Sequence, residues 1–153
     1  KVGMYALTYS VSDEAGNTKS EVRTVYVEAD GLAGSYAVSA TVTGPGAGSY
    51  TYTETITASS TDYNKLIISN FSGFPSLTVS AIVSGSSINV DQSVVYDFDG
   101  DSNPDNATLV SLGSSYTVDA SGASPVAKIL TINYQIDYGS GNIDGVTATY
   151  TKN

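Results

Sequence analysis

The chain has 153 residues, 15 of them acidic and 6 basic, with a formal net charge of −9 at pH 7 and with no cysteine or histidine. These counts exclude a disulfide framework, thiol nucleophiles, histidine-containing catalytic triads and zinc sites built on Cys or His. The negative charge and the lack of any Lys and Arg cluster indicate that nucleic acid is not a partner.

Residues 1–30 predict a β-hairpin. Apolar and polar residues alternate over 4–11 and again over 21–27, and the polar stretch 12–17 between them supplies a turn. Two strands alone are marginally stable in water. We therefore expect this hairpin either to complete a domain that begins upstream of the chain or to pack on the residues that follow.

The hairpin carries the pattern Tyr-x-Leu-x-Tyr-x-Val-x-Asp-x-x-Gly-Asn, followed by Arg-x-Val-x-Val. This pattern resembles the last two strands of bacterial immunoglobulin-like repeats, which serve in surface proteins as spacers or glycan-associated modules. The resemblance implies that residues 1–30 are the C-terminal hairpin of an Ig-like domain and that residues 31–153 form a second domain.

Residues 31–153 predict an all-β domain of eight or nine short strands. Turn residues such as those at 44–48 separate stretches of period-two alternation. An antiparallel meander of this kind forms either an up-and-down barrel or a two-layer sandwich, with Tyr36, Val38, Leu130 and Ile132 among the buried residues. The predicted strands cover residues 36–42, 50–57, 65–70, 77–84, 87–90, 93–97, 115–119, 128–138 and 145–152.

The order of several motifs across residues 31–153 resembles a family of Bacteroidetes surface lipoprotein domains of unknown function. The motifs are Gly-Ser-Tyr at 34–36, Lys-Leu-Ile-Ile-Ser-Asn-Phe at 65–71, Ile-x-Val-x-Gln at 88–92, Leu-Thr-Ile-x-Tyr at 130–134 and Thr-Tyr-Thr-Lys at 149–152. Members of the family, some of them lipocalin-like, are encoded in polysaccharide-utilisation loci. The resemblance implies an extracytoplasmic position, anchored to the outer membrane by a lipidated residue upstream of the chain. It also implies glycans or glycan-uptake proteins of the outer membrane as partners.

The stretch 97–106 is longer and more acidic than the family pattern, and it is the sharpest local signal for chemistry. Its spacing, Asp-x-Asp-x-Asp-x-Asn-x-Asp, places oxygen ligands at alternate positions, as calcium requires. It resembles the calcium loops of integrin-type propeller repeats, which implies the ligands Asp97, Asp99, Asp101, Asn103 and Asp105. The alternative is an acidic loop that is merely solvated.

Tyr50, Tyr52 and Glu54 share one face of a predicted strand and are candidate ligand-binding residues. A buried carboxylate is costly unless it is paired, so Glu54 could lie in a polar cavity with the tyrosines as a platform for a sugar ring. The alternative is that the threonines of this strand face inward or that Glu54 sits at a frayed edge.

No combination of residues predicts an enzyme. Of the four glutamates, three lie in the hairpin, which leaves little for a carboxylate pair of the kind that glycoside hydrolysis uses. We expect a non-catalytic surface module associated with polysaccharide binding and uptake. A purely structural spacer and a lipocalin-like carrier of small apolar ligands are the alternatives.

Overall fold

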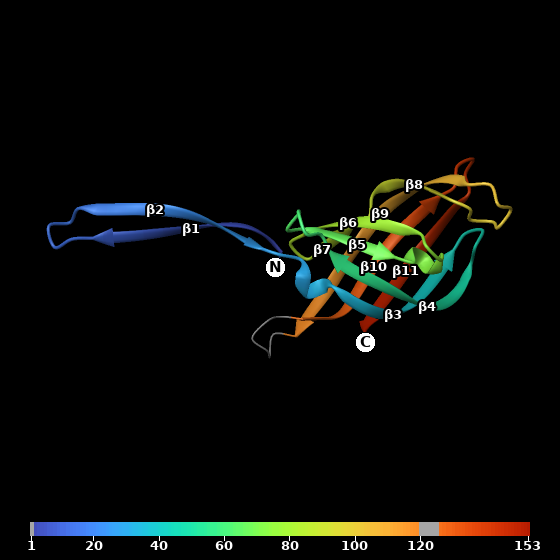
Figure 1. The fold of residues 1–153 in the computed structure, drawn as a ribbon, viewed down its shortest axis with the longest axis horizontal. Coiled ribbons are helices and arrows are strands. Elements are labelled where there is room, and N and C mark those ends of the chain that lie inside the picture. Colours follow the sequence, from blue (N-terminus) through green and yellow to red (C-terminus); the bar gives the residue numbers. More distant parts are fainter. Residues whose placement is uncertain (1, 120–125) are drawn as a thin grey trace.

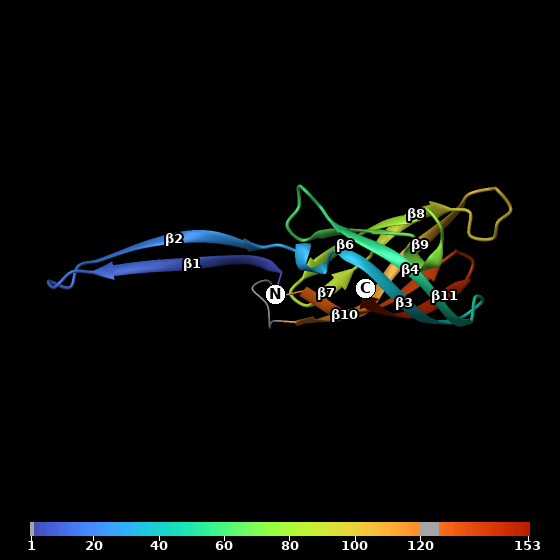
Figure 2. The same cartoon turned by 60° about the horizontal axis from the view of Figure 1, so that its bottom comes forward.

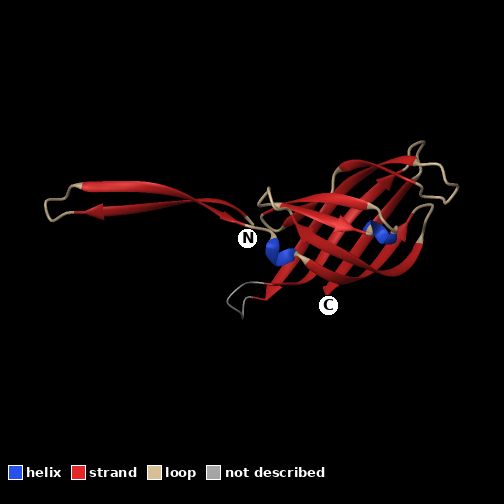
Figure 3. Cartoon of the chain, viewed as in Figure 1, coloured by secondary structure: helices blue, strands red, loops and turns tan. Residues whose placement is uncertain are grey.

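The computed structural model describes residues 2–119 and 126–153, and these residues form an all-β structure (Figures 1 and 3). A two-stranded N-terminal hairpin precedes a nine-stranded antiparallel sheet, as the sequence predicts. The strands are β1 (Gly3–Ser12), β2 (Thr18–Val27), β3 (Gly34–Thr43), β4 (Gly48–Ala58), β5 (Lys65–Ser69), β6 (Thr78–Ser84), β7 (Ser87–Asn89), β8 (Gln92–Tyr96), β9 (Asp105–Asp119), β10 (Val126–Asp137) and β11 (Ile143–Lys152). Two short 3-10 turns, η1 (Asp30–Leu32) and η2 (Phe71–Gly73), lie between strands.

The large sheet has the strand order β7-β6-β5-β4-β3-β11-β10-β9-β8. Strands β3 to β7 each pair with the next along the chain, as do β8 to β11, and β11 then returns to pair with β3. This is the order of an up-and-down barrel that is open between β7 and β8. The sheet is therefore a curled half-barrel, and the sandwich alternative is wrong because one continuous ladder joins all nine strands.

Serine side chains bridge the edge strand β7 and the neighbouring β9. Ser114 Oγ donates to the carbonyl of Ile88 at 2.8 Å and accepts the Ile88 amide, while Ser111 Oγ accepts the Val90 amide at 2.8 Å. Unpaired backbone groups at a sheet edge are costly when buried. These serines satisfy them where the backbone ladder is missing.

The core lies inside the curled sheet, and the period-two prediction of its residues is confirmed. Tyr36, Val38, Leu130 and Ile132 are at most 2% exposed. On the same strand as the last two, Ile129 points outward and is 46% exposed. Alternation thus assigns each side chain to one face of the pleated strands.

Strand β9 is longer than the sequence predicts. The alternation predicts a strand only over 115–119, yet β9 begins at Asp105 and its Ala107 and Leu109 are buried. Gly113 (φ 127°) lies beside a register shift between β9 and β10. This irregularity reverses the inward positions along β9, so no single alternation covers the whole strand.

The N-terminal hairpin projects away from the sheet (Figures 1 and 2). Its apolar residues, Tyr9 and Leu7 among them, are exposed. At its base the rings of Tyr26 and Tyr63 lie 5.0 Å apart, and Val2 forms an isolated bridge with Gly85. The origin of the hairpin in an Ig-like domain stays a prediction. Among the described residues, no helix is long and apolar enough to cross a lipid bilayer.

Candidate functional site

A cavity of about 400 Å³ opens at the end of the curled sheet opposite the hairpin. The β3–β4 and β10–β11 turns meet there because β11 pairs with β3, and the η2 turn, which follows β5, joins them because β5 pairs with β4. Its volume is in the range of small-molecule sites. The lining residues are Val42, Gly46, Tyr50, Thr51, Tyr52, Ser72, Gly73, Phe74, Ile136, Tyr138, Asp144 and Val146.

Asp144 is the carboxyl group of this lining, and it is 6% exposed. Its Oδ1 accepts the Gly46 amide at 2.8 Å, and its Oδ2 accepts the Tyr138 hydroxyl at 3.2 Å. A Cβ at Gly46 would lie 2.6 Å from Asp144 Oδ2, so the close approach of the turn requires glycine. Burial first, and Asp144 next, raise the pKa of Tyr138, which keeps its hydroxyl protonated as a donor.

Four aromatic rings form a cluster beside the cavity. Phe98 lies 5.0 Å from Phe74, 5.3 Å from Tyr96 and 5.1 Å from Tyr138, measured between ring centroids. Phe74 and Tyr138 also line a second hollow of about 490 Å³, which Phe98, Asp99 and Asp105 border. The two hollows share Gly46, Phe74, Tyr138 and Asp144. The end of the sheet therefore presents aromatic rings next to carboxyl groups.

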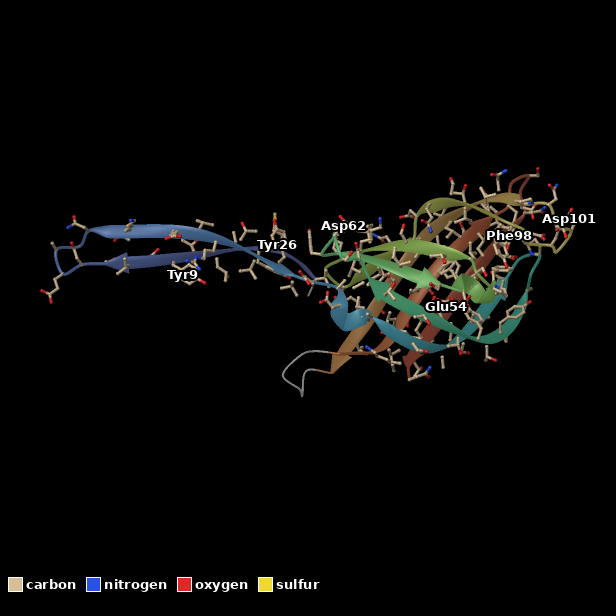
Figure 4. All side chains as sticks on the ribbon, in the orientation of Figure 1. Tyr9, Tyr26, Glu54, Asp62, Phe98 and Asp101 are labelled. Atoms are coloured by element: carbon tan, nitrogen blue, oxygen red, sulfur yellow. The ribbon has the colours of Figure 1, made fainter. Side chains whose placement is uncertain are left out.

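Along β4, burial increases from the exposed Tyr50 through the half-buried Tyr52 to the buried Glu54, while Thr53 and Thr55 are exposed. Tyr50 and Tyr52 line the cavity. Glu54 does not line it: the side chain is fully buried in the interior of the sheet (Figure 4). The predicted group is thus divided between the cavity wall and the core behind it.

Glu54 sits among tyrosines. Its Oε1 accepts the Ser72 amide at 2.8 Å. Within the described residues its Oε2 and the hydroxyls of Tyr52, Tyr134 and Tyr150 make no hydrogen bond of good geometry, although the Tyr150 hydroxyl is close enough to Glu54 to affect its pKa. Burial raises the pKa of Glu54 to about 8, although the Tyr150 hydroxyl and the Ser72 amide act in the opposite direction. The carboxyl group is therefore mainly protonated at neutral pH.

The acidic loop between β8 and β9 brings together three of its five predicted calcium ligands. Carboxylate oxygens of Asp97, Asp99 and Asp105 lie within 4.8 Å of one another. Asp101 lies outside this group and accepts the Asn103 amide at 2.7 Å. Figure 4 shows Asp101 at the tip of the molecule. Calcium binding stays a prediction.

A calcium titration followed by calorimetry tests the prediction that this loop binds calcium. We expect one site whose heat is lost in Asp99→Ala and only weakened in Asp101→Ala, because Asp101 lies outside the three-carboxylate group. Asp62→Ala, an exposed aspartate elsewhere, is the control and should titrate as the unmodified chain does. If no heat is released at millimolar calcium and Tm does not rise, the calcium prediction is wrong and the stretch is a solvated acidic loop.

Sequence reasoning did not assign Phe74, Phe98, Tyr138 and Asp144 to a ligand site. Tyr138 and Asp144 flank the turn 139–142, so their common position at one end of a hairpin could have been inferred. Their approach to Gly46 could not, because it depends on the pairing of β11 with β3.

No protein-family model and no curated protein sequence matches this chain. Its fold is similar to the crystal structure of a lipoprotein from Bacteroides thetaiotaomicron. The two share 18% sequence identity with a TM-score of 0.46, over 99% of this chain and 76% of that chain. At this level, the similarity does not identify a ligand.

Proposed function

We propose that this chain is a non-catalytic binding module that holds a carbohydrate in the cavity at the open end of the sheet. The observation that carries the proposal is the lining: the rings of Tyr50, Tyr52, Phe74 and Tyr138 line the same cavity as the carboxyl group of Asp144. Aromatic rings pack against the apolar faces of sugars, and a carboxylate accepts hydrogen bonds from sugar hydroxyls. Both oxygens of Asp144 keep lone pairs for such a contact.

The chemistry of the cavity favours neutral sugars. The chain carries a net charge of −9, which disfavours acidic glycans. Among the lining residues Asp144 is the one carboxylate, whereas glycoside hydrolysis uses a pair of carboxyl groups. This supports binding without cleavage.

The same proposal places the chain at a bacterial cell surface, attached through a lipidated residue upstream and acting beside glycan-uptake proteins. Its support is the motif order of residues 31–153. Localisation of the full-length protein by surface proteolysis of intact cells tests it, and full protection from protease would contradict it.

A glycan array, followed by calorimetry with any oligosaccharide that binds, tests the carbohydrate proposal. We expect Tyr50→Ala to weaken binding about tenfold, since a lost ring contact of about 1.4 kcal/mol corresponds to that factor. Asp144→Asn should weaken it as well. Tyr9→Ala, which removes an exposed ring from the hairpin (56% exposed, against 46% for Tyr50), is the matched control and should bind as the unmodified chain does.

Two other results would replace the proposal. If the array returns no neutral glycan and the cavity binds nothing, the chain is a structural spacer. If instead an uncharged apolar dye binds and Tyr50→Ala or Ile136→Ala weakens it, the cavity serves an apolar ligand.

A further inference from the structure

One wall of the cavity has an unusual backbone. The η2 turn supplies the lining residues Ser72, Gly73 and Phe74. Ser72 has φ 58° and ψ 22°, and Asn70, two residues earlier, has φ 60°. Two non-glycine residues therefore adopt left-handed conformations. Left-handed backbone is unfavourable for residues other than glycine. Such a turn persists only where surrounding contacts fix it.

Glu54 provides such a contact from behind the wall. Its Oε1 accepts the amide of Ser72, the left-handed residue itself, at 2.8 Å. The turn also packs closely on Tyr52, since a Cβ at Gly73 would lie 3.0 Å from that ring. Phe71, at the start of the turn, is buried with its ring 4.8 Å from that of Tyr134. Glu54 therefore makes a polar contact to this wall, whose other contacts named here are with aromatic rings.

The surroundings of Glu54 suit a neutral carboxyl group. Among the residues that the structure describes, the titratable groups that face it are all phenols: Tyr36 opposite it on β3, Tyr52 on β4, Tyr134 on β10 and Tyr150 on β11. Burial raises the pKa of each of these phenols, and none supplies a positive charge. The ammonium group of Lys152 instead donates to the Ala33 carbonyl and lies 5.9 Å from the Tyr36 ring centroid. Lys152 pairs with Tyr36 from β11, whereas Glu54 pairs with it from β4.

We propose that Glu54 is a positioning residue: its protonated carboxyl group holds the left-handed turn at Ser72 and so fixes the cavity wall, and ionisation releases that wall. A protonated carboxyl group has one O–H donor as well as an acceptor. It can therefore accept the Ser72 amide while donating to one of the unpartnered tyrosine hydroxyls. The ionised form has amide and hydroxyl donors near it but no positive charge to pair with, and the cost of its burial is relieved when the turn moves away and water enters.

Two consequences follow for the cavity. With the pKa of Glu54 near 8, the wall is held at neutral pH and loosens above it. Glutamine keeps an oxygen acceptor for the Ser72 amide but does not ionise, so Glu54→Gln should hold the wall at every pH. Leucine offers no acceptor, so Glu54→Leu should leave the wall displaced at every pH.

Carbon-13 labelling of the glutamate carboxyl groups, with nitrogen-15 labelling of serine, tests the proposal by NMR. Four carboxyl signals are expected, and one of them should titrate near pH 8 and be missing in Glu54→Gln. The Ser72 amide nitrogen should shift with the same midpoint in the unmodified chain and stay constant in Glu54→Gln. Glu21→Gln, which removes an exposed carboxylate of the hairpin, should leave both titrations unchanged.

A Ser72 signal that is flat from pH 6 to 9.5, or that shifts equally in Glu54→Gln, would overturn the proposal. The comparison of glutamate with glutamine decides the matter even if Glu54→Leu does not fold. The inference concerns the cavity of the proposed function, but this titration needs no ligand. If no glycan binds but the Ser72 amide titrates together with Glu54, only the carbohydrate proposal is wrong. If a glycan binds but the Ser72 signal does not change with pH, only the role of Glu54 is wrong.

Discussion

The free energy of unfolding should fall as pH rises from about 5 to 9, and Glu54→Gln should abolish most of this fall. Burial raises the pKa of Glu54 from 4.5 to about 8. Between these values the folded chain binds a proton that the unfolded chain has released, so its stability is fully present below pH 4.5 and is lost as pH passes 8. Each unit of pKa difference corresponds to about 1.4 kcal/mol.

Urea denaturation at intervals of one pH unit measures this effect. The window is favourable because the chain has no histidine or cysteine side chains, which ordinarily titrate in this pH range. Above pH 8 the glutamine variant should be the more stable of the two chains. Parallel stability curves for the two chains would show that Glu54 is already ionised in the folded state at pH 5.

Ile132→Ala should destabilise the fold by about 2–5 kcal/mol, the usual cost of such a deletion in a packed core. Ile132 is fully buried inside the curled sheet. The matched control is Ile129→Ala, on the outer face of the same strand, where Ile129 is 46% exposed. The control should lose less than about 1 kcal/mol, as exposed substitutions do.

The midpoints of urea denaturation give both values. Equal losses in the two variants would mean that the faces of β10 are wrongly assigned. A larger loss of stability in Ile129→Ala than in Ile132→Ala would mean that Ile129, and not Ile132, lies on the buried face of the sheet.

Alternation along single strands was enough to predict most of the fold. Tyr36 and Val38 on β3, and Leu130 and Ile132 on β10, are buried as predicted. The pattern failed on β9, where the bulge near Gly113 interrupts the alternation. On β4 it left the direction open, because tyrosine and threonine both occur on either face of sheets.

The neighbours of β4 decide its direction in the structure. Its Ile56 lies opposite the buried Ile68 of β5, and its Glu54 lies opposite the buried Tyr36 of β3. Partners in adjacent strands point to the same face. Glu54 is therefore forced inward despite its polarity, and the position of its carboxyl group follows from sheet pairing rather than from its own strand.

The all-β class, the hairpin, the turns and the inward residues of most strands could be predicted from the amino-acid sequence, because they depend on which side chains repeat with the period of a strand. The curling of the sheet into a half-barrel and the pairing of β11 with β3 could not, and they are seen only in the folded chain. That closure joins residues about a hundred positions apart and brings Gly46 to Asp144. Such a contact leaves no local pattern, since it depends on how all nine strands pair and twist together.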